Sequence, residues 1–208
     1  MCTTKPIGII DYGVGNLQSI VNALNYLKIP NKIVNDAKDL HNFSKAILPG
    51  VGSFEYGMKN LTQTSFSNSI DELVKSKDFF LLGICLGMQL LYEYSEEDDG
   101  CKGLGIIQGK VKRIKSKKNI KVPNIGWRKI VNSNESILLK DIEIEPIFYF
   151  VHSYACETLN KKVVTGVLNY GESFDAIIET GNIFGAQFHP EKSQAAGLKV
   201  LKNFSQII

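Results

Sequence analysis

The chain has 208 residues, which is long enough for one well-buried domain and short for two. Its apolar share of 44% and charged share of 22% are ordinary for a globular protein, and a net charge of +3 does not indicate nucleic-acid binding. No apolar run reaches the roughly 18 residues of a membrane span, and no export signal is recognisable, so we expect a cytoplasmic protein without membrane contact.

The first half of the chain alternates short apolar runs with segments of helical spacing. We expect strands at 7–10, 32–34, 46–48 and 79–84, and helices at 17–27, 58–61, 70–74 and 86–94. The run at 79–84 is continuously apolar, as is typical of a strand covered on both faces. Strand–helix alternation of this kind predicts an α/β fold with a mostly parallel sheet flanked by helices.

Strands predominate in the second half, which we expect to be rich in β-hairpins. Residues 105–130 alternate around a polar break at 116–119 and predict a hairpin. Further strands are expected at 147–152, 163–168, 176–179 and 183–188, with a tight turn at Gly181-Asn182 and a closing helix at 198–204. No repeat, low-complexity tract or linker interrupts the chain, so residues 1–208 are predicted to form a single domain.

The most informative motif is Gly83-Ile84-Cys85-Leu86-Gly87, which lies where a buried strand runs into a helix. A nucleophile on such a turn has a strained backbone and an exposed side chain, and its neighbours at minus two and plus two must be small. The start of the helix carries partial positive charge and stabilises a thiolate, while the N–H of Leu86 can bind an oxyanion. The alternative is a core cysteine on a glycine-rich turn.

A base for Cys85 is predicted in Gln187-Phe188-His189-Pro190-Glu191. If the chain stays extended through Pro190, His189 and Glu191 point to the same side. The carboxylate then orients the imidazole and stabilises its protonated form. The alternative is a satisfied histidine at a strand end, but it weakens when the cysteine motif and this pair occur together. His41 is expected at the surface, and His152 at the end of a strand that lines a site.

The remaining cysteines give no sign of a metal or redox pair. The four cysteines are not closely spaced and only three histidines are present, so we expect free thiols and neither metal nor organic cofactor.

The loop Pro49-Gly50-Val51-Gly52-Ser53-Phe54 follows a strand and should share the rim of the sheet with Cys85. We expect a second oxyanion donor there, at Val51 or Gly52. Neither this loop nor Gly13-Val14-Gly15-Asn16 completes a nucleotide-binding motif.

Taken together, these motifs resemble the class I (triad) glutamine amidotransferases, a flavodoxin-like fold, and most of all the glutaminase subunits of imidazole glycerol phosphate synthases. The likeness runs nearly end to end and includes Tyr149-Phe150-Val151-His152-Ser153-Tyr154 and the extension Lys192-Ser193. It implies that Cys85 attacks the side-chain amide of L-glutamine, forms a thioester and releases ammonia and glutamate. It also implies that Gln89 and Glu97 hold the amino-acid end of the substrate, with backbone groups of Gly50, Ser153 and Tyr154.

The resemblance further implies that the partner in a heterodimer is a (β/α)₈-barrel synthase. The partner receives the ammonia, forms imidazole glycerol phosphate and AICAR in histidine biosynthesis, and activates the glutaminase. The implied interface residues are Asn16, Trp127, Tyr149 and Lys192. The family usually has Pro-His-x-Gly-Trp-Asn where this chain has Pro123-Asn124-Ile125-Gly126-Trp127-Arg128, in a segment that resembles the partner-facing surface of the family. The identity of the ammonia acceptor therefore stays open.

Three alternatives stay open as well. A paralogous glutaminase could supply ammonia for amidino-sugars of surface polysaccharides. A cysteine hydrolase of the same fold would share the motif around Cys85, although Gln89 and the His-Pro-Glu pairing speak against it. A catalytically inactive binding subunit is disfavoured by the intact triad. The Lys- and Arg-rich run at 110–121 favours a solvated hairpin over a partner contact or a lure for an anionic substrate.

Overall fold

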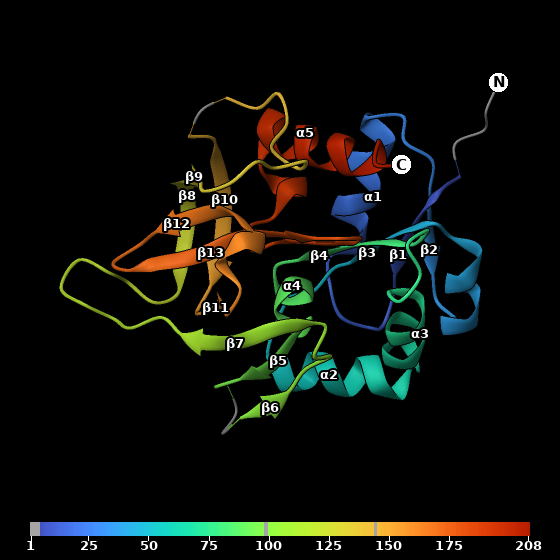
Figure 1. The fold of residues 1–208 in the computed structure, drawn as a ribbon, viewed down its shortest axis with the longest axis horizontal. Coiled ribbons are helices and arrows are strands. Elements are labelled where there is room, and N and C mark those ends of the chain that lie inside the picture. The colour runs from blue at the N-terminus through green and yellow to red at the C-terminus, as the bar shows by residue number, and fades with distance from the viewer. Residues whose placement is uncertain (1–4, 98–99, 144) are drawn as a thin grey trace.

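A computed structural model describes residues 5–97, 100–143 and 145–208 (Figure 1). In the first half, the strands and helices occur in the predicted order. Their bounds are β1 (Ile7–Ile10), α1 (Leu17–Tyr26), β2 (Asn31–Val34), a 3₁₀ helix (Ala37–Asn42), β3 (Lys45–Leu48), α2 (Phe54–Gln63), α3 (Phe66–Leu73), β4 (Phe80–Ile84) and α4 (Leu86–Leu90).

The prediction of a helix to residue 94 was wrong. Helix α4 ends at Leu90, and the chain continues as β5 (Tyr92–Ser95), which pairs in parallel with β7. Tyr92 is fully buried, and its hydroxyl hydrogen-bonds to the Thr158 hydroxyl at 2.8 Å. Leu90, Leu91 and Tyr92 are all buried, so their apolar run fits a helix as well as a strand, and pairing with a distant segment decides between them.

The second half is built almost entirely of strands. They are β6 (Cys101–Lys102), β7 (Ile107–Arg113), β8 (Asn124–Lys129), β9 (Val131–Asn132), β10 (Ile147–His152), β11 (Tyr154–Thr158), β12 (Val164–Asn169), β13 (Ser173–Thr180) and β14 (Ile183–Ala186), with 3₁₀ helices at Lys161–Val163 and Pro190–Lys192 and the closing helix α5 (Gln194–Ser205). The predicted tight turn is confirmed, because Thr180 pairs with Ile183 across Gly181-Asn182 and Gly181 has a φ of 57°.

The predicted hairpin at 105–130 was wrong in its pairing. Both arms are strands, but β7 pairs with β11 and β5, while β8 pairs with β10. Strands β10 and β11 follow each other around Ser153, so each takes one arm of the expected hairpin into a different sheet. Alternation in sequence predicts that a segment is a strand without identifying its partner.

Among the described residues, twelve strands form one mixed sheet in the order β2-β1-β3-β4-β14-β13-β11-β7-β5-β6, with β12 also paired to β13 and β9 paired to β12. The pairings from β2 to β14 are parallel, and those from β14 to β7 are antiparallel. Strands β8 and β10 form a separate two-stranded sheet. The mostly parallel sheet flanked by helices is as predicted, and it places the carboxyl ends of β1, β3 and β4 at one edge (Figure 1).

Two buried clusters cover the faces of the sheet. Helices α1 and α5 pack on one face, where they meet alternate strand residues such as Ile9 and Ile47, and α2 and α3 pack on the other, against Ile10 and Leu48 (Figure 1). This follows from the period of two along a strand, which sends successive side chains to opposite faces. In the described part of the chain no helix combines the length and apolarity needed to cross a membrane.

Candidate active site

Cys85 sits between β4 and α4 with φ 53° and ψ −111°, a strained conformation for a residue other than glycine. A Cβ on Gly83 would lie 2.7 Å from the carbonyl oxygen of Gly87, so the two arms of the turn do pass close together. A Cβ on Gly87 would lie 1.9 Å from the carbonyl oxygen of Leu48. Gly87 is therefore required by the neighbouring strand β3, a constraint that the local motif did not reveal.

His189 and Glu191 form a hydrogen-bonded pair whose Nδ1 and Oε1 atoms are 2.8 Å apart. Their side chains are 3% and 2% exposed. The expectation that the chain stays extended through Pro190 was wrong, since residues 190–192 form a 3₁₀ turn with Pro190 at its start, where the missing N–H costs nothing. The turn holds the carboxylate against the ring because the N–H of Lys192 donates to the carbonyl of His189.

The backbone of His189 is fixed from both sides. Its N–H donates to the carbonyl of Tyr149 at 3.0 Å. The hydroxyl of Ser193 donates to the carbonyl of His189 at 2.6 Å and accepts the N–H of Tyr149 at 2.9 Å. Tyr149 on β10 and the hydroxyl of Ser193 thus hold the backbone that carries the His189 ring.

The sulfur of Cys85 and the ring of His189 line the same cavity. Burial by itself would lower the pKa of His189, but the neighbouring Cys85 thiol and the Glu191 carboxylate outweigh it and raise that pKa well above its ordinary value. Within the described residues, Nε2 of His189 has no hydrogen-bond partner. The arrangement favours a protonated imidazole beside the sulfur of Cys85.

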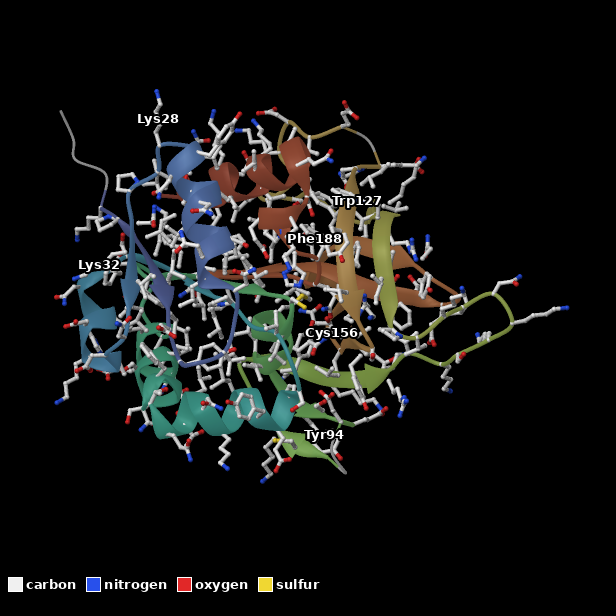
Figure 2. All side chains as sticks on the ribbon, turned by 180° about the vertical axis from the view of Figure 1, so that it is seen from behind. Lys28, Lys32, Tyr94, Trp127, Cys156 and Phe188 are labelled. Carbon is white, nitrogen blue, oxygen red and sulfur yellow. The ribbon has the colours of Figure 1, made fainter. Side chains whose placement is uncertain are left out.

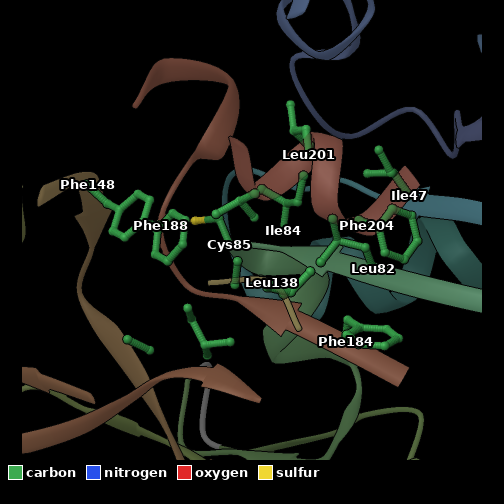
Figure 3. Close-up of a cluster of buried hydrophobic side chains, with 14 of the residues drawn as sticks. Ile47, Leu82, Ile84, Cys85, Leu138, Phe148, Phe184, Phe188, Leu201 and Phe204 are labelled. Carbon is green, nitrogen blue, oxygen red and sulfur yellow. The ribbon is translucent and has the colours of Figure 1, made fainter. Parts of the chain in front are cut away.

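The cavity has a volume of ≈ 320 Å³, which is the size of a small-molecule site. It is lined by Val51, Gly52, Cys85, Leu86, Gln89, Glu97, Pro123, Val151, His152, Ser153, Tyr154 and His189. Figure 3 shows the sulfur of Cys85 pointing toward Phe188 at the end of the buried apolar cluster. The structure therefore brings together the predicted nucleophile, base, oxyanion loop and most of the residues implied for substrate binding.

Gly50 lies beside this cavity instead of in its wall. It lines a small adjoining void with Asn16, His189 and Glu191. A Cβ on Gly50 would lie 2.8 Å from the Cβ of Leu86 and 2.9 Å from the backbone nitrogen of Gly87, so the loop packs directly on the turn that carries Cys85. The next residues of this loop, Val51 and Gly52, are exposed, and Gly52 has a φ of 103°.

Two side chains implied for substrate binding are held by hydrogen bonds. Glu97 accepts the backbone N–H of Phe54, at the start of α2, at 2.9 Å. Gln89 donates its Nε2 to the carbonyl of Tyr154 and to Oε1 of Gln187, each at 3.0 Å. Its amide is therefore oriented with both N–H groups engaged, and its Oε1 remains an acceptor for a positively charged ligand group.

His152 contributes a feature that the sequence did not reveal. Its Nδ1 lies 2.7 Å from the carbonyl of Tyr154, and its Nε2 lies 3.0 Å from Nδ2 of Asn124. A carbonyl only accepts, so Nδ1 carries the proton and Nε2 accepts from the amide. Asn124 is fully buried, so this departure from the family pattern changes the interior next to the cavity and not an exposed surface.

His152 should remain uncharged across the physiological pH range. Burial, with a smaller contribution from the nearby His189, outweighs the hydrogen bond to the carbonyl of Tyr154 and lowers the pKa of His152 to about 4. A second ring proton would also face the N–H donors of Asn124. We expect the ring signals of His152 in an NMR titration, assigned with a His152→Gln variant, to stay constant from pH 8 to pH 5. A midpoint near the ordinary value of about 6.5 would contradict the arrangement.

The residues implied for the partner interface cluster around the 3₁₀ turn at 190–192. Trp127 on β8 and Tyr149 on β10 form an edge-to-face pair with ring centroids 5.9 Å apart. Both β10 and α1 contact the turn, which brings Tyr149 and the exposed Asn16 toward the exposed Lys192. Figure 2 shows Trp127 at the surface of the β8–β10 sheet, with Phe188 inside the molecule.

The basic run at 110–121 is partly neutralised within the chain. Lys110 pairs with Glu96 at 2.8 Å, and Lys112 pairs with Glu157 at 3.0 Å and Glu172 at 3.3 Å. These pairs lie along β7 and its neighbours, so the first part of the run is a strand with carboxylate partners.

The expected surface position of His41 agrees with its exposure in the structure.

Comparison with known proteins gives a consistent result. The family described as Glutamine amidotransferase class-I matches residues 8–207. Relatives named imidazole glycerol phosphate synthase subunit HisH include that of Leptospira borgpetersenii, 42% identical over 97% of this chain and 100% of its own length. The HisH protein of Moorella thermoacetica is 44% identical over 98% and 96%. That of Bacillus subtilis is 42% identical over 97% and 96%.

Solved structures share the fold at much lower sequence identity. A glutamine amidotransferase superposes with a TM-score of 0.75 at 17% identity, covering 98% of this chain and 100% of its own. A chain of PurLQS from Thermotoga maritima gives a TM-score of 0.71 at 17% identity, covering 97% and 98%. At these identities the likeness concerns the arrangement of strands and helices alone.

Proposed function

The chain belongs to the class I glutamine amidotransferase family, and from this premise we propose that residues 1–208 form a single glutaminase domain, the glutamine-hydrolysing subunit of an imidazole glycerol phosphate synthase. The observation that carries the proposal is the position of Cys85 on a strained turn, beside an imidazole that is held by a buried carboxylate. Relatives at 42–44% identity over nearly the whole chain carry the name of this synthase subunit, which supports delivery of the ammonia to imidazole glycerol phosphate synthesis over delivery to an amidino-sugar.

Cys85, His189 and Glu191 supply the chemistry in this proposal. The thiolate attacks the side-chain amide carbon of L-glutamine, a C–S bond forms, and the carbonyl electrons move to oxygen. His189 gives its proton to the amide nitrogen, which leaves as ammonia while the thioester forms. Water then attacks the thioester, His189 takes the water proton, and glutamate leaves as sulfur regains its charge. Glu191 stabilises the imidazolium whenever it forms.

The walls of the cavity bind the rest of the substrate. The N–H of Leu86 and an N–H of the loop at Val51 or Gly52 stabilise the oxyanion. Oε1 of Gln89 and the carboxylate of Glu97 accept from the ammonium group of glutamine, with backbone groups at Gly50, Ser153 and Tyr154 completing the amino-acid site. None of these steps calls for a metal or an organic cofactor.

The ammonia passes to a (β/α)₈-barrel synthase subunit in a heterodimer. Asn16, Trp127, Tyr149 and Lys192 lie around the turn that carries Glu191, so a partner bound there contacts the segment that positions His189. This arrangement supports activation by the partner, because small shifts at the turn are transmitted to the base through the hydrogen bonds that the Ser193 hydroxyl makes with Tyr149 and His189.

The test is glutamate release by the purified chain, measured alone and with the barrel subunit of an imidazole glycerol phosphate synthase. We expect slow hydrolysis alone and an increase of roughly 5- to 150-fold in the complex, the usual range of allosteric coupling. Formation of imidazole glycerol phosphate from glutamine would accompany the increase. Equal turnover alone and in complex would contradict the activation, and absence of the product would reject this acceptor.

A further inference from the structure

Gln187 is a buried glutamine that lies beside the sulfur of Cys85. It follows β14, which pairs in parallel with β4, and the N–H of Cys85 donates to the carbonyl of the preceding residue, Ala186, at 2.8 Å. The Gln187 residue is 1% exposed, and its Nε2 lies 3.9 Å from Sγ of Cys85. The amide is therefore a permanent neighbour of the sulfur and not a mobile surface group.

The orientation of the Gln187 amide is fixed by its other neighbours. Gln89 contacts both the carbonyl of Tyr154 and the Gln187 amide through the same atom. A carbonyl only accepts, so that atom is the nitrogen of Gln89, and the Gln187 atom facing it must be Oε1. The Nε2 of Gln187, the other polar atom of the same amide, is then the atom that faces the sulfur.

Cys156 supports the same orientation from another side. Its Sγ lies 3.9 Å from Oε1 of Gln187, in the distance range of a thiol donating to an amide oxygen. Burial raises the pKa of Cys156, so this thiol keeps its proton and acts as a donor. Two donors, from Gln89 and Cys156, thus converge on Oε1 of Gln187 and hold its N–H groups toward Cys85.

We infer that Gln187 is a further catalytic residue, whose side-chain N–H donates to the sulfur of Cys85 and stabilises the thiolate. When the thiol proton moves to Nε2 of His189, the electron pair stays on sulfur, and a fixed buried N–H favours that charged form more than the neutral thiol. The inference rests on the proposed function, because it assigns Cys85 as the nucleophile.

The test measures the rate at which iodoacetamide alkylates Cys85, as a function of pH, in the full-length chain without substrate. Mass spectrometry of the peptide that contains Cys85 separates this reaction from alkylation of the other cysteines. In Gln187→Met the side chain remains unbranched but loses the N–H donor. We expect its rate profile to move up by about one pH unit, so that alkylation is about tenfold slower below the midpoint.

Gln187→Glu is a second variant of nearly the same shape, which guards against a packing defect in Gln187→Met. Its oxygen replaces the donor nitrogen, so alkylation should again be slower than in the wild type above neutral pH. Cys156→Ser is the matched control, because it touches the same amide at Oε1, keeps a donor there and leaves Nε2 in place. The alkylation rate of Cys156→Ser should remain within about twofold of the wild-type rate at each pH, because replacing one hydrogen-bond donor by another changes the free energy by only a small amount.

The inference would be overturned if Gln187→Met, or Gln187→Glu should the first variant not fold, gave the wild-type alkylation profile at an unchanged melting temperature. Glutamate release by the wild-type protein of the same preparations, measured with the barrel subunit added, tests the proposed function separately. If that release is absent, the proposed function fails whatever the profiles show. If it is present and the profiles coincide, only the role of Gln187 fails.

Discussion

Cys85→Ala should abolish glutamine-dependent product formation by the complex and leave ammonia-dependent formation intact. Among the cysteines that the structure describes, Cys85 alone lines the cavity. Cys156 is fully buried with a pKa raised by burial, so it does not supply a thiolate in place of the nucleophile. Loss of the nucleophile of a triad costs on the order of 10⁶-fold in turnover. The measurement is synthase product formed from glutamine and, separately, from an ammonium salt.

The ammonium experiment makes the result specific. If the chain delivers ammonia, the barrel partner needs only an outside supply when the glutaminase is inactive, and its rate should approach that of the wild type. Cys156→Ser, which replaces a buried thiol and keeps a donor to Oε1 of Gln187, should retain glutamine-dependent activity. Full activity of Cys85→Ala would reject Cys85 as nucleophile, and failure of the ammonium rescue would argue against ammonia as the delivered product.

Features that depend on neighbouring residues were predictable from the sequence. The turn at Cys85 requires Gly83 within two residues, and the pairing of His189 with Glu191 spans a separation of two. The strand–helix alternation of the first half likewise reflects local periodicity, which is why its order was correct. The pair survived an error in backbone conformation, because a 3₁₀ turn brings the two side chains together as well as an extended strand would.

Features that depend on distant partners were not predictable. The two arms of the predicted hairpin at 105–130 pair with β10 and β11, which come later in the chain, and not with each other. The end of α4 was decided by pairing with β7. The contact of Gln187 with Cys85 spans 102 positions and arises only because β14 lies beside β4. Nothing in a single sequence specifies these neighbours, although Gln187 stands within the motif that contains His189.

The buried position of Asn124 shows the same limit at the level of one residue. Its segment resembles the partner-facing surface of the family, which suggested a change at that surface. The side chain instead reaches the ring of His152 inside the molecule, because β8 and β10 pair with Asn124 directly opposite His152. The substitution relative to the family pattern therefore concerns the wall of the cavity before it concerns the partner.

Removing the charge of the Glu191 carboxylate should lower glutamine-dependent turnover strongly, although less than removing the sulfur of Cys85. In Glu191→Gln, an amide of the same shape can still accept the Nδ1–H of His189 through its oxygen, so the ring keeps a partner. It carries no charge to balance an imidazolium, and the pKa of His189 should fall. The amide NH₂ would also occupy the place of Oε2, which is buried without a partner among the described residues, and would be left unsatisfied there.

We therefore expect Glu191→Gln to lower glutamine-dependent turnover by roughly 10²- to 10⁴-fold at neutral pH, the upper value being that of the equivalent change in a serine triad. Glu191→Asp keeps the negative charge on a side chain that is shorter by one methylene group, so its turnover should fall less than that of Glu191→Gln. Ammonia-dependent synthesis by the complex serves as the control for an intact partner. Turnover in Glu191→Gln within threefold of the wild type would show that the carboxylate is not needed to stabilise the imidazolium.

The same substitution should change stability with a definite dependence on pH. The folded-state pKa of His189 is raised to about 10 from 6.5, so the folded state binds the proton more tightly than the unfolded state. This contribution to stability is fully present below about pH 6.5 and is lost as the pH rises through the folded-state pKa. The difference in melting temperature between wild type and Glu191→Gln should therefore be large at pH 6.5 and shrink steadily toward pH 10. A difference that stays constant or grows over this range would mean that His189 is not the group whose proton the carboxylate holds.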